Sequence, residues 1–187
     1  MRCRILAAIL ISVFPMLLPA AAFALQTPSV EAQVKAAFLF NFAQFIQWPR
    51  QAFAGPEMPF TMCITGDSFD GVLEKTVEGE TLNGRRIAVR RLGASDIPKD
   101  CHLVYVGRLE ARRSAEVITA ASGMPVLTVG DSEDFINDGG MIRFMEVGHR
   151  VRFEINPDAA DRASLRVSSR LLRLADIARP RERAAIR

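Results

Sequence analysis

Residues 60–68 read FTMCITGDS, a short apolar run that passes through a glycine into two residues that often cap helices. A shorter copy, TVGDS, stands at residues 128–132, and a looser one, VYVGR, at residues 104–108. Each copy predicts a strand, a glycine turn and the start of a helix. Alternation of this kind is typical of an α/β domain with a mixed, mostly parallel sheet.

The rest of the chain supports the same architecture. The pattern predicts helices at residues 30–47, 68–78 and 109–121, one or two helical turns at 132–137, and strands at 60–65, 86–92, 102–106 and 125–129. It also predicts a hairpin of residues 141–147 and 150–156, followed by a last helix from Pro157 to about Ile177. We therefore expect a three-layer α/β sandwich whose mostly parallel sheet ends in an antiparallel hairpin and a C-terminal helix.

The first 24 residues have the features of a secretory signal peptide. Arg2 and Arg4 form a basic start, residues 5–18 are apolar, and Ala22-Phe23-Ala24 is a small-x-small cleavage site. An uncleaved membrane anchor is the alternative, but the apolar run is short for a membrane span. The sequence thus predicts cleavage near Ala24 and a periplasmic protein.

Composition limits the remaining possibilities. Apolar residues make up 49% and charged residues 24% of the 187-residue chain, which excludes a disordered, collagenous or multi-span membrane protein. Residues 25–160 carry 14 basic and 18 acidic side chains, whereas residues 161–187 carry 8 arginines and 3 acids. The positive charge is therefore C-terminal, which argues against nucleic-acid binding. We expect a single domain over residues 25–178 and a flexible basic tail over residues 179–187.

Three glycines follow predicted strands and would lie at one edge of a parallel sheet, where ligands of open α/β sheets often bind. The candidate ligand edge consists of Gly66, Asp67, Ser68, Gly107, Gly130, Asp131 and Ser132. Two interpretations stay open. Glycine can simply make the turn while Asp or Ser caps the next helix, or the edge can hold a small molecule.

The sequence offers no convincing catalytic group. Gly66-Asp67-Ser68-Phe69 is similar to the nucleophile block of one esterase class, but such an enzyme needs a histidine base near the serine. His102 lies at a predicted strand start and His149 in a predicted hairpin turn, so neither fits that role. Phosphate-binding loops and zinc motifs do not occur in the sequence. We expect a protein that is not an enzyme and holds no cofactor or metal.

Two cysteines, Cys63 and Cys101, remain after removal of the signal peptide. Both lie in or next to predicted core strands, and export would expose them to an oxidising compartment in which thiol pairs close. A bridge between them would stabilise the fold by roughly 4 kcal/mol on the chain-entropy model. The alternative is two buried free thiols that behave as small apolar side chains.

Arginines of the predicted last helix recur at positions 162, 166, 170 and 173, a spacing that places them on one helical stripe. The stripe is either a solvated face or a docking surface for an acidic partner. In the strand before it, Val151, Phe153 and Ile155 should face the core, while Arg152 and Glu154 should face outward.

Several blocks together resemble one known family. Residues 35–49, KAAFLFNFAQFIQWP, are similar to the signature helix of the YfiR-like periplasmic proteins. The other matching blocks are Cys63 in the first strand, Cys101 before VYVG, GGMI at residues 139–142, VRFEIN at 151–156 and LRVSSRLL at 165–172. The resemblance covers residues 30–178.

The resemblance implies a role. The best-described YfiR-like protein represses an inner-membrane diguanylate cyclase, and an outer-membrane lipoprotein can sequester it; the output is cyclic di-GMP and therefore biofilm formation. Family members can form homodimers. The resemblance implies a Cys63–Cys101 bridge and a partner-contacting role for Glu154, to which we add Arg152, Arg166 and Arg170. The family's second cysteine pair is missing, so redox control through it is not expected. A periplasmic small-molecule sensor is the alternative function.

Overall fold

The computed structural model describes residues 29–66, 69–93, 96–108 and 111–178. The predicted signal peptide, the predicted basic tail and the candidate ligand residues Asp67 and Ser68 lie outside the described residues. Among the described helices, none has both the length and the apolar character needed to cross a membrane.

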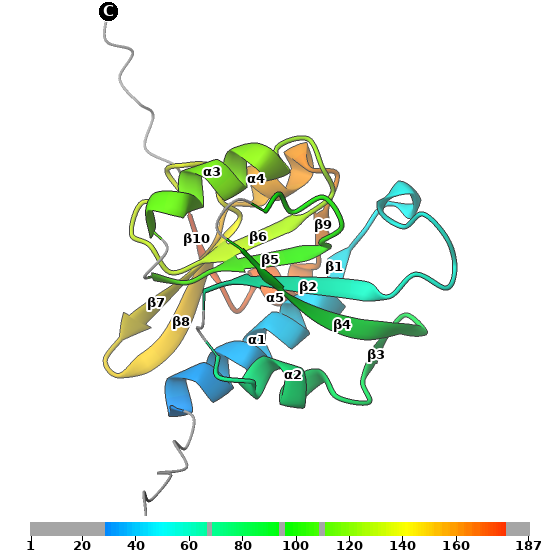
Figure 1. Ribbon diagram of the computed structural model, residues 1–187. Helices are drawn as coiled ribbons and strands as arrows, with labels where there is room; N and C mark the ends of the chain where they lie inside the picture. The colour runs from blue at the N-terminus through cyan, green and yellow to red at the C-terminus, as the bar shows by residue number, and fades with distance from the viewer. Residues whose placement is uncertain (1–28, 67–68, 94–95, 109–110, 179–187) are drawn as a thin grey trace, which may run out of the picture.

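An eight-stranded sheet forms the centre of the molecule (Figure 1). Its pairings are parallel except within two hairpins, β7–β8 and β3–β4. In spatial order the strands are β10 (Asp176–Ile177), β8 (Arg150–Ile155), β7 (Ile142–Val147), β6 (Leu127–Gly130), β5 (Leu103–Val106), β2 (Phe60–Thr65), β4 (Arg85–Leu92) and β3 (Thr81–Leu82). The predicted mostly parallel sheet with a late antiparallel hairpin is confirmed.

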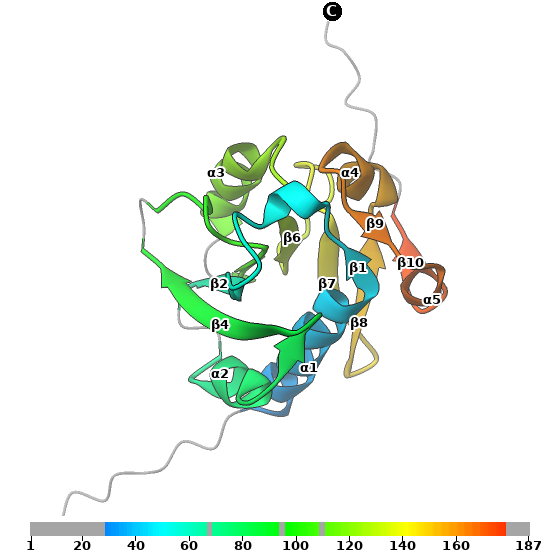
Figure 2. The ribbon, with the colours of Figure 1, turned by 90° about the vertical axis from the view of Figure 1, so that its right-hand side faces the viewer.

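Helices cover both faces of this sheet, so the predicted three layers are confirmed. On one face, α1 (Val30–Phe45) and α2 (Val72–Val77) pack over a core that includes Leu39 and Phe42. On the other face, α3 (Ala111–Ala121) covers a second core, in which Val117 packs with Val104 and both cysteines. Figure 2 shows α1 and α2 on one side of the sheet and α3 on the other. The central strands are apolar on both sides because both sides are buried.

The helix α1 begins where its sequence indicates and ends two residues earlier than expected. The Ser29 hydroxyl accepts a hydrogen bond from the Ala32 amide at 3.1 Å and thereby caps the first turn. The helix was expected to extend to residue 47, but it ends at Phe45 because Ile46–Gln47 form a short strand, β1. This strand pairs antiparallel with β9 (Arg166–Val167) in a separate two-stranded sheet. The carboxyl end of α1 is thus joined to the late part of the chain.

The prediction of one long last helix is wrong. Pro157 does begin a helix, but α4 (Pro157–Arg162) is short, and Ser164 then adopts a left-handed φ of 58°. The chain continues as β9, a four-residue helix α5 (Ser169–Leu172) and β10. The four arginines of the expected stripe therefore do not share a helix face.

Three smaller differences have local causes. The helix expected from residue 68 begins only at Val72, because Asp70 and Gly71 adopt positive φ values of 46° and 82°. Residues 132–137 contain turns in place of a helical segment. The Trp48-Pro49 pair is followed by a 3-10 turn, Arg50–Ala52, and the hairpin strand β3 was not foreseen.

Candidate partner-binding surface

The β7–β8 hairpin is anchored to α1 by an aromatic cluster. Phe153 lies 5.3 Å from Phe38 and 4.9 Å from Phe42, and Phe144 lies 5.6 Å from Phe42, measured between ring centroids. Edge-to-face and stacked aromatic pairs of this kind stabilise by about 1 kcal/mol beyond their burial. The inner face of the hairpin is therefore fixed against α1.

Charged side chains on the outer face of the hairpin are fixed by ion pairs and hydrogen bonds. The guanidinium of Arg143 on β7 lies 2.5 Å from the carboxylate of Glu154 on β8, and about a fifth of each side chain is exposed. Arg143 also donates to the Glu133 carbonyl at 3.0 Å. Because the guanidinium of Arg143 contacts both Glu154 and the Glu133 carbonyl, the Glu154 carboxylate is held in a defined position. The sequence analysis did not identify Arg143 as a candidate residue.

Arg152 lies on the same outer face, beside the last strand. Its guanidinium lies 3.7 Å from the carboxylate of Asp176 on β10, and about half of each side chain is exposed. The strand β10 pairs only with Glu154 and Ile155 of β8. Arg152 and its ion pair therefore remain accessible to solvent.

The other two predicted partner residues lie on the elements that replace the long helix. Arg166 is exposed on β9, opposite Gln47 of β1. The Arg170 guanidinium on α5 lies 5.9 Å from the centre of the Phe45 ring. Figure 2 shows β9, α5 and β10 on the β8 side of the molecule. We call the set Arg143, Arg152, Glu154, Arg166 and Arg170 the late surface. Its first three members lie on the outer face of the β7–β8 hairpin, whereas its last two lie beside the carboxyl end of α1.

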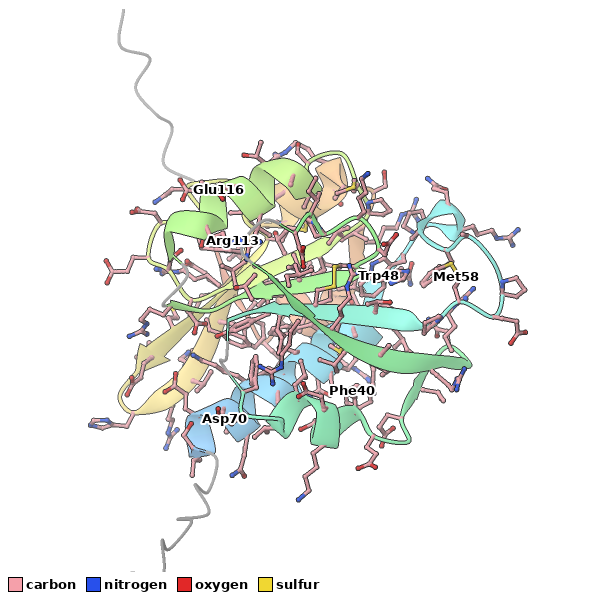
Figure 3. All side chains as sticks on the ribbon, in the orientation of Figure 1. Phe40, Trp48, Met58, Asp70, Arg113 and Glu116 are labelled. Carbon is pink, nitrogen blue, oxygen red and sulfur yellow. A yellow bond between two sulfur atoms is a disulfide. The ribbon has the colours of Figure 1, made fainter. Side chains whose placement is uncertain are left out.

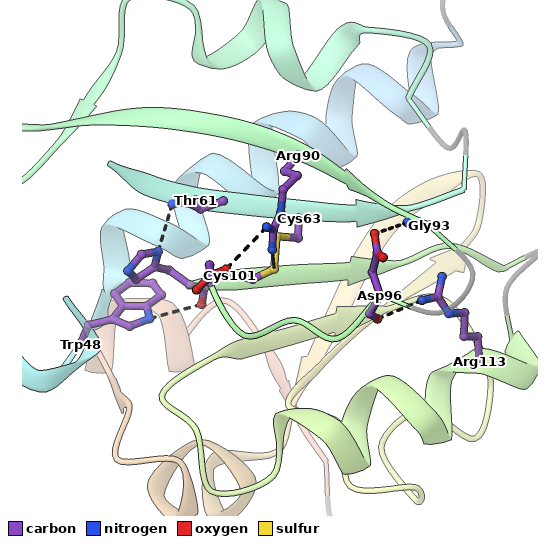
Figure 4. Close-up of a disulfide and its surroundings, with 10 residues drawn as sticks. Trp48, Thr61, Cys63, Arg90, Gly93, Asp96, Cys101 and Arg113 are labelled. Carbon is purple, nitrogen blue, oxygen red and sulfur yellow. Dashed lines mark hydrogen bonds and ion pairs between the residues drawn. A yellow bond between two sulfur atoms is a disulfide. The ribbon is translucent and has the colours of Figure 1, made fainter. Parts of the chain in front are cut away.

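The predicted disulfide is present. Cys63 on β2 and Cys101, just before β5, are bonded with a Cα–Cα distance of 5.8 Å, and both are buried in the α3-side core. A guanidinium nitrogen of Arg90 lies 3.4 Å from the Cys101 sulfur (Figure 4). The bridge therefore joins β2 to the segment that enters the neighbouring strand β5, close to β4.

The residue after Cys101 ties the Trp48 segment to the sheet. His102 stacks between Phe53 and Phe60, at 4.5 and 5.1 Å, and its carbonyl accepts a hydrogen bond from the Trp48 indole. Its Nδ1 accepts from the Thr61 amide, so the ring proton is on Nε2, 3.1 Å from the carbonyl oxygen of residue 52. Burial lowers the pKa of His102. This histidine is structural and neutral, and the neighbouring Trp48 is partly buried.

Gly66, Gly107 and Gly130 lie at the carboxyl ends of three neighbouring parallel strands, β2, β5 and β6. At the β6 end the chain fills this edge itself, because a Cβ on Gly130 would lie 2.3 Å from the Phe135 ring. The hydroxyl of Ser132 lies 3.4 Å from that of Ser114 on α3. These contacts account for Gly130 and Ser132 without a ligand.

Asp131 belongs to a buried polar cluster that the sequence did not reveal. Its carboxylate accepts hydrogen bonds from the Lys35 ammonium and the Tyr105 hydroxyl, each at 2.6 Å. Burial, followed by the negative charge of Asp131, raises the pKa of Tyr105. The Lys35 ammonium also contacts Glu31 at 2.6 Å, and this hydrogen bond lowers the pKa of Glu31. The cluster fastens α1 to the end of β6.

The Trp48 segment, the bridged cysteines and the late hairpin all lie within the span that one family model matches. The model described as YfiR/HmsC-like matches residues 32–176. The chain belongs to the YfiR/HmsC-like family. This family is periplasmic, is regulatory rather than catalytic, and acts with a membrane diguanylate cyclase. Family membership thus indicates a regulator of cyclic di-GMP signalling.

This YfiR-like chain departs from the expected family pattern in the late hairpin. The hairpin region contains Met141, Met145 and Val147, and the sequence has no cysteine after Cys101. Arg143 also donates toward the Met145 sulfur at 4.0 Å. In this protein, the hairpin is held by the aromatic cluster and the Arg143–Glu154 pair.

Proposed function

We propose that this protein represses an inner-membrane diguanylate cyclase by binding its periplasmic domain through the late surface, and so lowers cyclic di-GMP and biofilm formation. The observation that supports this most is the position of Arg152 and Glu154. Both charges project from the outer face of a hairpin whose inner face is packed rigidly on α1. A preorganised surface loses little conformational entropy on binding.

Repression by binding requires a difference in affinity between two states of the partner. Holding a two-state cyclase about 99% inactive, from a starting point about 99% active, takes roughly 5.5 kcal/mol of differential binding. Several charged contacts around an apolar centre can supply this energy. An outer-membrane lipoprotein that bound the same surface would release the cyclase by competition. In this proposal the chain acts in the periplasm after cleavage near Ala24, and a homodimer would present two such surfaces.

The primary test is deletion of the gene, which should raise cellular cyclic di-GMP, with restoration by the wild-type gene. Unchanged nucleotide levels after deletion would refute the proposal. Complementation with Arg152→Glu should restore repression poorly, because this substitution reverses an exposed charge. Glu116→Arg on α3, whose side chain points away from the sheet in Figure 3, is the matched control and should complement fully.

Glu154 needs a separate design because its pair with Arg143 also supports the hairpin. Glu154→Arg alone leaves two half-buried guanidinium groups together and should weaken both folding and binding. The double variant Arg143→Glu/Glu154→Arg restores the ion pair with its direction reversed. We expect the double variant to recover thermal stability and to remain defective in co-purification with the cyclase. Recovery of both properties would show that Glu154 acts only within the fold.

A further inference from the structure

The strand β4 has an outer edge that the sheet does not use. On its inner side, β4 pairs with β2 over residues 87–92. On its outer side, β3 pairs only with Arg85 and Arg86. Within the described residues, no strand lies beside the outer edge of β4 from residue 87 onward. Such an edge is a template for an added strand.

The β3–β4 turn determines which backbone groups face outward. Asn83 and Gly84 form a two-residue loop with φ values of 51° and 80°, so Leu82 and Arg85 flank it as the hydrogen-bonded pair. Because hydrogen-bonding direction alternates along a strand, Val89 turns its amide and carbonyl toward the outer edge. A segment placed there can pair with backbone groups that β2 does not use.

One face of this edge is an apolar groove. Half-buried Ile87 and Val89 line a groove of about 780 Å³, and Val77 of α2 forms part of its opposite wall. Figure 1 shows α2 running alongside β4. Charged side chains of both signs stand around the groove, namely Glu74, Glu78, Glu80, Lys75 and Arg86, and Glu74 is paired with Arg91 at 3.3 Å. The apolar floor between them favours apolar side chains.

The other face of the same edge is basic. Arg86, Ala88 and Arg90 are two residues apart along β4 and so share this face, and both arginines are exposed. Arg90 has an acidic neighbour, Asp100, at 3.7 Å, but 42% and 73% of the two side chains are exposed, so this pair contributes little. The two faces of β4 thus differ, since one offers an apolar floor and the other offers exposed guanidinium groups.

We propose that β4 is a second docking edge, which adds to its sheet an extended segment of a partner protein in which acidic and apolar residues alternate. The apolar residues would fill the groove beside Ile87 and Val89, and the acidic residues would lie over Arg86 and Arg90. A second copy of this chain is a poor occupant. Pairing of two β4 strands would bring together two copies of Arg85, Arg86, Arg90 and Arg91, and like charges that face each other across a sheet are destabilising.

The proposal can be tested on the mature chain without the cyclase, so it stands or falls independently of the proposed function. The probe is the acetylated and amidated peptide Ser-Val-Asp-Val-Glu-Val-Ser, titrated against the 15N-labelled protein. We expect amide shifts centred on β4, including Val89. The peptide with both acids replaced by lysine should bind about tenfold more weakly. Absence of binding at millimolar peptide, or shifts centred elsewhere, would overturn the proposal.

Charge reversal on the protein provides the specificity control. Arg86→Glu/Arg90→Glu should reverse the preference, so that the lysine peptide binds about tenfold better than the acidic one. Arg150→Glu, an exposed charge in the late hairpin, should leave both affinities unchanged. Equal binding of both peptides to the double variant would contradict the charge argument. The protein without peptide could also form a dimer. If Arg86→Glu/Arg90→Glu changes that dimerisation, a second copy is the occupant and the proposal is overturned.

Discussion

Removal of the Cys63–Cys101 bridge should cost a large part of the stability of this protein. The two residues are 38 positions apart, and closing a loop of that size lowers the entropy of the unfolded chain by an amount worth about 4 kcal/mol. Domains of this size are usually stable by about 5–15 kcal/mol. Reduction should therefore lower the melting temperature by about 8–16 °C, at about 2–4 °C per kcal/mol.

Substitution adds a packing loss to this entropic loss. Both cysteines are almost fully buried in the α3-side core, with exposed fractions of 0% and 4%. Cys63→Ala/Cys101→Ala removes two buried sulfur atoms and should cost about 1–2 kcal/mol more than reduction alone. Reduced wild type, which keeps both sulfur atoms, is therefore the proper control for the double variant.

Urea unfolding, monitored by the fluorescence of the single tryptophan Trp48, can measure the loss of stability on reduction and on substitution. Oxidised wild type, reduced wild type and the double variant should rank in that order, and only the wild type should respond to reductant. The dependence on urea should be steeper for the reduced chain, because its unfolded state is less compact. A reduced protein within about 1 kcal/mol of the oxidised one would refute the reasoning.

Two further predictions concern buried polar groups. Because burial lowers the pKa of His102, the unfolded chain takes up a proton first as the pH falls below about 6.5, so stability should fall between pH 7.5 and 5.5. His102→Gln should reduce this loss, as measured by urea midpoints at both pH values; an unchanged loss would contradict it. Asp131→Asn should destabilise by about 3 kcal/mol, because Lys35 keeps only the half-exposed Glu31 as a charged partner. Glu31→Gln is the control and should cost less than about 1 kcal/mol by denaturation; equal costs would show that Asp131 has no special role.

The sequence predicted the centre of the sheet well because local signals decide it. The strands β2, β5 and β6 are short apolar runs that end near glycine, as buried parallel strands do. Gly148 and His149, with φ values of 57° and 59°, form the turn of the late hairpin. In these segments a few neighbouring residues are sufficient to specify the conformation.

The late segment was mispredicted because distant contacts decide it. Arginine spacing fitted a helix, but Ser164 takes a left-handed conformation and Val167 pairs with Ile46 across the molecule. A local signal was present, since the Ser168 hydroxyl accepts from the Leu171 amide and caps a new helix. Arg166 and Arg170 consequently lie on two separate elements beside α1. No periodicity in the sequence could show this placement.

The buried polar groups were missed for a related reason. Lys35 has the spacing of a core position of α1, and Asp131 was predicted either to cap a helix or to contact a ligand. The 2.6 Å contact joins two residues that are 96 positions apart in the sequence. Single residue types do not reveal such pairs. A lysine in an otherwise apolar helical stripe does, however, indicate that a buried acidic partner should be sought.

The residues that stabilise the fold and the residues proposed to bind partners lie in different parts of the structure. The disulfide, the His102 stack and the Lys35–Asp131 pair are all buried between layers, so substitutions there should act on folding. The charges of β8 and β4 lie at opposite ends of the strand order and project from the sheet, so reversing Arg152 or Arg86 should alter binding with little loss of stability. For a regulator this division is useful, because its affinity for each partner can then change without loss of the structure that presents the surface.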